Sequence, residues 1–446
     1  MQKSFFSIEI NILKNIVILF MLFTTSVNIS CSNSENINNP NENKFATSKE
    51  YWNSKVDYLP LNDSEFPYAG IPRLVIKTNN LQTINDRDTK IPAKMQLWGE
   101  SSPTSEVIDL TIKGRGNSSW LYMPKKSYKI ELSSKNNLLG MPKDRDWALI
   151  SNYADKTLMK NYLMYHLSSK LGAFYSPRCE FVELFLNNEY LGVYLLTETI
   201  KVGINRVNIP KNNASYIIEK TESYQEKDQL IYPKSTNGSD STRFKVHYPK
   251  NASKEALSTI KNHIEFFEEY LTKNKFGQDC HIDQWININE YTKYYWVQEL
   301  SKNPDAATYS SIFFSWIKGG TITMGPVWDF DLAFGGYNKE TISQSSEWLI
   351  KKGYWHHSIL KDTIVARARI NFWKDNKQIF FETINTADSI FSILNKAASN
   401  NFRKWNVLQS TKYIYHRHSY KSYKDAVDDL KSWIQNRLEW IDRELQ

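Results

Sequence analysis

The spacing of apolar and polar positions in the first half of the chain predicts strands interrupted by one helix. From about residue 74 to residue 132, short alternating runs such as 107–113 and 127–132 are typical of half-buried strands separated by turns. Residues 155–171 carry Leu, Met and Tyr at helical spacing, and a glycine follows as a natural stop. Two more strand-like runs, 180–186 and 190–196, flank an Asn-Asn-Glu turn that suits a hairpin.

The second half is predicted to be mainly helical around one hairpin. Residues 254–273 and 289–300 have the apolar spacing of helices. A strand at 311–317, a Lys-Gly-Gly turn and residues 321–324 form the predicted hairpin. From about residue 355 onward the pattern is helical, and it ends in a helix over 423–445. Residues 221–245 are polar and are expected to form an excursion between these two parts.

The order of the first-half elements resembles that of a protein-kinase small lobe. The strand at 107–113 leads directly into Gly114-Arg115-Gly116, and the next strand carries Lys129. In kinases a glycine-containing loop, a lysine-bearing strand, a helix and two further strands follow one another. The glycines would let backbone N–H groups approach phosphates, with Arg115 and Lys129 neutralising phosphate charge. A Gly-x-Gly turn, a loop arginine and a strand lysine are each more often structural, so that alternative stays open.

Acidic residues on both sides of the predicted hairpin carry a sharper signal. Asp305 precedes the hairpin, and Asp329 and Asp331 follow it. A kinase large lobe has a catalytic-loop Asp before such a hairpin and a metal-binding Asp after it. Mg²⁺ prefers oxygen ligands, commonly one or two carboxylates with phosphate oxygens and water, while another carboxylate can take the proton of an acceptor hydroxyl. The alternative is that Asp305 caps a turn and Asp329 closes a strand.

The first fifty residues are expected to direct export. Two lysines precede a short apolar core near residues 16–23, as in a secretory signal, and the core is too short to span a bilayer comfortably. Cys31 follows small and polar residues, as at a bacterial lipobox, although Asn28 stands where that pattern usually has Leu. We expect a signal peptide over 1–30, lipidation of Cys31 and a flexible tether over 31–50. An unlipidated signal peptide and a membrane anchor are the alternatives.

Composition narrows the class of protein without naming a function. The 446 residues are 41% hydrophobic and 14% aromatic, which excludes a wholly disordered chain. A net charge of +8 is mildly basic and spread along the sequence, so a polyanionic partner is not required, and the basic cluster near 412–424 is interpreted as a solvated face rather than a nucleic-acid site. Three cysteines are too few for a disulfide framework.

A set of ordered sequence blocks resembles the CotH family, which is named for a spore-coat protein and includes atypical protein kinases. The blocks include Lys113-Gly114-Arg115-Gly116-Asn117, Glu299-Leu300-Ser301-Lys302-Asn303-Pro304-Asp305 and residues 325–335. Further blocks lie at residues 124–129, 140–147, 155–161, 181–187 and 192–198. The resemblance covers about 91–336, a little over half of the chain, and the number of ordered blocks makes it specific.

The resemblance implies an α+β, two-lobed, atypical protein-kinase-like fold with a helical C-terminal extension. The kinase-like domain would occupy 51–350, with a small lobe at about 74–200, a large lobe at about 250–350 and a helical region at 351–446. The implied function is ATP- and Mg²⁺- or Mn²⁺-dependent phosphoryl transfer to a Ser or Thr hydroxyl of a protein substrate. A lipid anchor would hold this enzyme at the cell envelope, facing the periplasm or the cell surface.

The resemblance also implies roles for particular residues. Asp305 matches the catalytic Asp, and Asp329, with Asp331 and Ser310, would hold the metal. The nucleotide would be contacted by Lys129, Arg115 and Gly116, and Glu198, at the position of a kinase hinge, would either face it or pair with a lysine.

Three departures from ordinary kinases lower the expectation of a copied mechanism. The helix over 155–171 contains no Glu to pair with the nucleotide lysine. Ser310 stands where kinases have a metal-binding Asn, and Pro304 stiffens the backbone before Asp305. The main rival is therefore a non-catalytic structural or binding module at the cell surface, a class favoured by the scarcity of ATP outside the cytoplasm. Binding of an extracellular polymer such as a glycan is a third hypothesis, for which the aromatic content is weak support.

Overall fold

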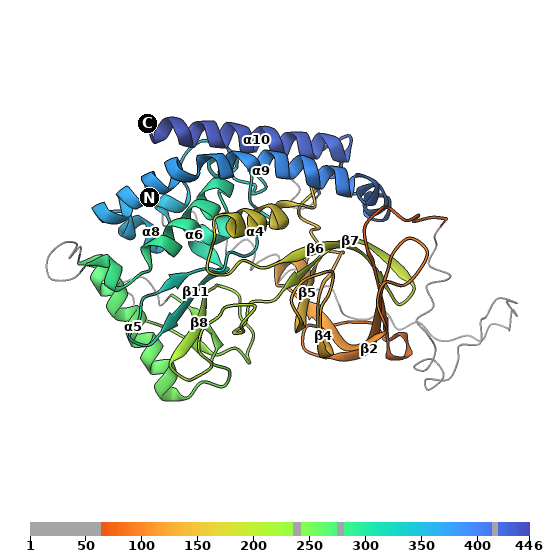
Figure 1. The fold of residues 1–446 in the computed structure, drawn as a ribbon, viewed down its shortest axis with the longest axis horizontal. Helices are drawn as coiled ribbons and strands as arrows, with labels where there is room; N and C mark the ends of the chain where they lie inside the picture. The colour runs from red at the N-terminus through yellow and green to blue at the C-terminus, as the bar shows by residue number, and fades with distance from the viewer. Residues whose placement is uncertain (1–63, 235–241, 274–280, 413–417) are drawn as a thin grey trace, which may run out of the picture. The chain divides into compact units, whose positions relative to one another are not determined.

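The computed structural model describes residues 64–234, 242–273, 281–412 and 418–446. The expected signal peptide, tether and lipidated Cys31 therefore lie outside the described residues. Within them the chain is a mixed α and β protein, in which a β-barrel is followed by a second sheet and a helical C-terminal region (Figure 1). None of the helices in these described ranges is both long and apolar enough to cross a membrane.

Seven strands close the barrel in the order β1-β2-β3-β4-β5-β7-β6. Their bounds are β1 (Arg73–Thr78), β2 (Ile91–Trp98), β3 (Ile108–Arg115), β4 (Ser127–Asn136), β5 (Asp144–Ile150), β6 (Cys179–Leu186) and β7 (Glu189–Glu198). Neighbouring strands are antiparallel except β1 and β6, which pair in parallel and close the barrel. Every second residue of a strand points to the inside of the barrel, and such residues from neighbouring strands, for example Ile112, Ile130 and Leu149, form one buried apolar cluster.

The second sheet has the order β12-β11-β8-β10-β9 and contains the expected hairpin. Its strands are β8 (Ser215–Lys220), β9 (Leu230–Ile231), β10 (Phe244–Tyr248), β11 (Ile312–Ile317) and β12 (Thr323–Met324). The hairpin prediction is confirmed, because β11 pairs antiparallel with β12. Residues 221–245 are not only an excursion, since β9 and the start of β10 lie within them and pair with each other.

Long helices pack around both sheets. They are α4 (Lys160–Lys170), α5 (Lys254–Thr272), α6 (Ile288–Ser301), α9 (Thr363–Lys404) and α10 (Tyr423–Glu444), with short helices α3 (Ser118–Leu121), α7 (Glu340–Ser343) and α8 (Tyr354–Ile359). Helix α9 contacts α4, α6, α10 and strand β7. The shorter helix α10 lies beside α9 (Figure 1). Side-chain caps fix several helix starts, including a capping box between Ser422 and Asp425 in α10.

Candidate active site

The hairpin of the second sheet brings acidic residues from both of its ends into one region. Asp305 begins the short π-helical turn η3 (Asp305–Tyr309) before β11, and Asp329 and Asp331 follow β12. The buried side chain of Asn303 joins the two ends. Its Nδ2 donates to the Asp329 carbonyl at 3.0 Å, and its Oδ1 accepts from the Asp305 N–H at 3.2 Å. One amide therefore sets the distance between the two acidic segments.

The three carboxyl groups share one electrostatic environment. Burial, followed by the charges of Asp329 and Asp331, raises the pKa of Asp305 well above its ordinary value. Burial, with the neighbouring Asp329 charge, raises the pKa of Asp331 to about 7. Burial also raises the pKa of Asp329, although the Arg115 guanidinium and the Ser311 hydroxyl act in the opposite direction. Burial and mutual repulsion thus disfavour the charged forms of these carboxyl groups, and a bound cation would relieve that repulsion.

Arg115 is a basic side chain that faces this acidic group. It ends strand β3, and its guanidinium carbon lies 5.2 Å from the centre of the Trp328 ring. Burial lowers the pKa of Arg115, while Tyr165, Asp329 and Asp331 raise it. No hydrogen bond or ion pair occupies this guanidinium among the described residues. An arginine whose N–H donors are free, beside carboxyl groups that favour a bound cation, is suited to bind phosphate oxygens.

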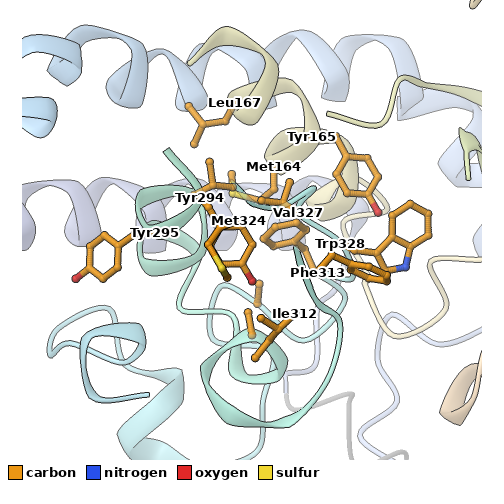
Figure 2. Packing of buried hydrophobic residues seen from close by; sticks show 14 of the residues in the cluster. Met164, Tyr165, Leu167, Tyr294, Tyr295, Ile312, Phe313, Met324, Val327 and Trp328 are labelled. Atoms are coloured by element: carbon orange, nitrogen blue, oxygen red, sulfur yellow. The ribbon is translucent and has the colours of Figure 1, made fainter. Parts of the chain in front are cut away.

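Aromatic and apolar side chains form the packed base of this region. Tyr165 of α4 stacks on Trp328 with ring centroids 5.6 Å apart. Figure 2 shows these two rings facing each other beside Val327 and Phe313, with Met164 of α4 nearby. Trp328 therefore packs against a helix as well as lying under Arg115.

Lys129 and Glu198 lie in ion pairs on the barrel. The Lys129 ammonium is 3.0 Å from Asp146 Oδ1 on the adjacent strand β5. The fully buried Glu198 accepts from Tyr175 Oη at 3.0 Å and from Arg178 Nε at 2.8 Å, and it also pairs with Arg206. The Glu198 carboxylate is thus occupied by arginines, which is nearer to the ion-pair alternative than to nucleotide contact. Both nucleotide assignments stay predictions.

The glycines near Arg115 have structural reasons of their own. Gly114 lies inside β3 rather than in a loop, and its N–H donates to the Asp86 carbonyl at 3.0 Å. A Cβ at Gly114 would lie 2.5 Å from ring carbons of Trp120, so only glycine admits that ring. Gly116 has φ +94°, a conformation that glycine adopts without strain. The predicted phosphate contact at Gly116 is compatible with this turn but untested by it.

The predicted metal residue Ser310 and several polar groups that the sequence did not single out complete the region. The Ser310 hydroxyl lies 3.1 Å from that of Thr221, whereas its neighbour Ser311 donates to Asp329 Oδ2 at 3.4 Å. Glu219 on β8 adds further negative charge beside Asp329, and its Oε2 lies 2.7 Å from His247 Nε2, within hydrogen-bonding distance. Asn303 and Asn161 stand inside the CotH-like blocks, and that position is the one signal that could have found them.

The region fits a divalent cation that is completed by a ligand. Among the described residues, no group of three or more His, Cys, Asp or Glu side chains is arranged to hold a metal by itself. Mg²⁺ at phosphate-transfer sites usually takes one or two carboxylates and completes its shell with phosphate oxygens and water. Asp329 and Asp331 are close enough to interact electrostatically and would supply the carboxylate oxygens of that donor set.

Comparison with known proteins identifies the family. The family model described as CotH kinase protein matches residues 112–441, a range that includes Arg115, Asp305 and Asp329 and covers more than half of the chain. The chain belongs to the CotH kinase protein family. This confirms the resemblance drawn from the sequence blocks, and CotH membership implies possible kinase activity, with a nucleotide and an acceptor substrate. The barrel and helical region are consistent with a kinase-like CotH fold. No curated protein matches the sequence significantly.

Proposed function

We propose that this CotH protein transfers the γ-phosphoryl group of ATP to a Ser or Thr hydroxyl of a protein. The observation that carries the proposal is that Asp305 lies close to Asp329 and Asp331, and that these two face the Arg115 guanidinium, which has no hydrogen-bonding partner in the described residues. Three carboxylates that repel one another favour a cation, and an unoccupied guanidinium favours an anion. A metal-bound triphosphate satisfies both requirements at once.

Asp305 would act on the acceptor hydroxyl. In the proposed step the acceptor oxygen forms a bond to the γ-phosphorus, the bond from that phosphorus to the β–γ bridging oxygen breaks, and ADP leaves. The acceptor proton passes to the Asp305 carboxylate. Because burial and neighbouring carboxylates raise the pKa of Asp305, this carboxylate accepts a proton more readily than an exposed aspartate does.

Arg115, Asp329 and Asp331 would hold the nucleotide. Arg115 would donate to phosphate oxygens and stabilise charge on the transferred group. Asp329 and Asp331 would ligate Mg²⁺ or Mn²⁺, which, when bound, neutralises phosphate charge and polarises the group that is transferred. Lys129, Gly116 and Ser310 are retained as secondary contacts in this proposal, and Glu198 as a support of the strand that ends near the nucleotide.

The wider architecture and location are part of the same proposal. The barrel would serve as the small lobe and the second sheet with its helices as the large lobe, in agreement with the order of the candidate residues along the chain. The amino-terminal sequence supports an exported lipoprotein anchored through Cys31, facing the periplasm or the cell surface. Metabolic labelling with a fatty acid, compared between wild type and Cys31→Ala, tests the anchor, and equal labelling would contradict it.

The test of activity uses the full chain purified in detergent. The protein is incubated with γ-labelled ATP, Mg²⁺ or Mn²⁺, and a mixture of dephosphorylated proteins as acceptors. We expect wild type to transfer label, and Asp305→Asn to lower the rate at least ~100-fold because a positioned general base contributes about 10²–10⁴. Asp329→Ala should also abolish transfer. Asp428→Asn, on the exposed face of α10, is the control expected to retain full activity.

Two further measurements separate the alternatives. Transfer of label from α-labelled ATP would indicate nucleotidyl rather than phosphoryl transfer. ATP binding is measured through the rise in melting temperature that a ligand of the native state produces. Arg115→Ala should weaken the affinity for ATP about 10- to 100-fold, since a hydrogen bond to a charged group contributes about 1.5–3 kcal/mol. A wild-type protein with neither transfer nor a nucleotide-dependent melting shift would support the non-catalytic module instead.

A further inference from the structure

Helix α4 occupies the place in the chain where an ordinary kinase has the glutamate that pairs with its nucleotide lysine, yet α4 contains no acidic residue. Lys129 instead takes an aspartate from the neighbouring strand β5. The usual connection between this helix and the nucleotide site is therefore missing. Besides the packing of Tyr165 on Trp328, α4 makes polar contacts with the site through Lys160 and Asn161, the first two residues of the helix.

Asn161 binds the acidic segment through both ends of its amide. Its Oδ1 accepts from the Phe330 N–H at 2.9 Å, and its Nδ2 donates to the Asp331 carboxylate. The same amide receives Tyr165 Oη at 3.4 Å and donates to Asn152 Oδ1 at 3.3 Å. Since Phe330 N–H can only donate and the Asp331 carboxylate accepts, these two contacts fix the orientation of the amide. Asn161 is fully buried, so water cannot replace these hydrogen bonds without rearrangement.

Lys160 holds the backbone of the same segment. Its buried ammonium donates to the Ala333 carbonyl at 2.8 Å and to the Asp331 carbonyl at 3.4 Å. A Cβ at Gly336 would lie 2.8 Å from this ammonium, so glycine at that position admits the lysine. Two consecutive side chains of α4 thus contact the segment between Phe330 and Gly336.

The start of α4 is itself firmly fixed. The Asp155 carboxylate accepts from the Lys160 N–H at 2.9 Å and from the Thr157 N–H and hydroxyl at 2.8 and 2.5 Å. The Asn152 amide donates to the Leu158 carbonyl at 2.9 Å. A residue that is held by its own turn can transmit that rigidity to the group that it touches.

We propose that Asn161, supported by Lys160, is the positioning residue that orients Asp331 and its segment toward a nucleotide-bound cation, in place of the missing helix glutamate. The inference rests on the proposed phosphoryl transfer. Asn161 is not a catalytic residue here, because it touches the carboxylate and backbone that hold the cation rather than the reacting atoms. Partners of this kind, which orient a metal-binding side chain, typically change metal affinity or activity 10- to 100-fold when they are removed.

The test compares Asn161→Ala and Lys160→Met with Ser168→Ala, a buried polar residue on the same helix that contacts neither Phe330 nor Asp331. Binding of Mn²⁺ to each full-length protein with a non-hydrolysable ATP analogue is measured by the electron paramagnetic resonance signal of free Mn²⁺. We expect both variants to bind Mn²⁺ about 10- to 100-fold more weakly and to lose kcat to a similar extent. The KM for the acceptor protein should stay within about twofold of wild type, as should every value for Ser168→Ala.

Each outcome decides between positioning and simple structural support. Folded variants with wild-type Mn²⁺ affinity and kcat would overturn the inference, as would a loss of thermal stability alone. If Asn161→Ala does not fold, Lys160→Met decides, because it removes a buried ammonium and keeps a side chain of similar length. If wild type shows no nucleotide-dependent Mn²⁺ binding, the proposed function fails. If wild type and both variants bind Mn²⁺ equally, only the positioning role of Asn161 is refuted.

Discussion

Replacing Glu299 with glutamine should destabilise the whole helical region, because this carboxylate is fully buried and fully used. Its Oε1 lies 2.8 Å from Arg437 Nη2 and accepts from the Leu349 N–H at 2.8 Å. Its Oε2 accepts from the Lys351 N–H at 2.7 Å and from Tyr295 Oη at 3.2 Å. Both sides of the carboxylate therefore face donors. Glutamine has one acceptor side and one donor side, so in either orientation its NH₂ group opposes two donors.

The cost follows from the burial of the pair. Removing one partner of a buried ion pair costs about 3–5 kcal/mol, because the remaining charge is left without compensation. Arg437 keeps hydrogen bonds to the carbonyls of Ser345, Glu347 and Glu299, at 3.0, 2.8 and 3.0 Å, so the lower figure applies. For 446 residues, an unfolding entropy near 2.1 cal/mol/K per residue gives about 0.9 kcal/mol/K, and 3 kcal/mol then lowers the melting temperature by about 3 °C.

The assay is urea denaturation followed by circular dichroism, with melting temperature as a second readout. Glu299→Gln, Arg437→Met and the double variant form a double-mutant cycle, and Asp428→Asn removes an exposed ion pair of α10 as the control. The control should change the free energy of unfolding by less than about 0.5 kcal/mol. The reasoning is refuted if Glu299→Gln is as stable as the control, or if the two single-variant costs add without coupling.

Three further predictions concern other parts of the chain. Gly114→Ala should lower the free energy of unfolding by about 1–3 kcal/mol in urea denaturation, because the new methyl would lie 2.5 Å from ring carbons of Trp120. Gly99→Ala is the control and should be nearly neutral, because its methyl would lie 3.4 Å from the nearest atom, on Thr104. Equal effects of the two substitutions would contradict the prediction. Burial would raise the pKa of Asp146, but nearby lysines outweigh it and hold the pKa at about 2, so this residue stabilises the protein above its ordinary pKa. Asp146→Asn should therefore cost about 1 kcal/mol at pH 7, and the difference should shrink as the pH falls from about 4 toward 2; a difference independent of pH would argue against it. The raised pKa of Asp305 means that its charge destabilises the folded protein above its ordinary pKa. Without nucleotide or metal, Asp305→Asn should therefore melt at a higher temperature than wild type at pH 7, with the gain vanishing near pH 4, and a lower melting temperature would refute this reading of the acidic cluster.

Local patterns in the sequence were sufficient for most individual elements. The helix expected over 254–273 is α5, and the hairpin expected over 311–324 is β11 and β12. These elements are decided by the spacing of nearby apolar residues, and their polar flanks contain the signals that end them. The hairpin in turn placed Asp305 and Asp329 correctly at its two ends, because a hairpin fixes which distant residues become neighbours.

Contacts between residues far apart in the chain could not be predicted from the sequence, for a physical reason. Closure of the barrel depends on β1 pairing in parallel with β6, more than a hundred residues later, and no local pattern encodes that partner. The same holds for Lys129, whose partner is chosen by the register of β4 and β5. Asn161 and Asn303 were not identified as site residues, although both lie in the CotH-like blocks, because an amide side chain does not titrate and its role depends on which backbone groups the fold brings to it.

The acidic region lowers the stability of the folded protein, and this cost is understandable if the region binds a ligand. A fold selected only for stability would not gather three mutually repelling, partly exposed carboxyl groups beside only Arg115 and Lys160. The surrounding structure holds them in place through Asn303 and Asn161, each of which uses both ends of one amide. Asn303 holds the backbone of Asp305 and Asp329, and Asn161 contacts the Asp331 carboxylate, so these amides position the acidic residues without neutralising their charge. A bound cation would compensate the charge that remains, and Arg115 would be left to contact the phosphate chain, so these hydrogen bonds would prepare the region to bind a metal-bound nucleotide.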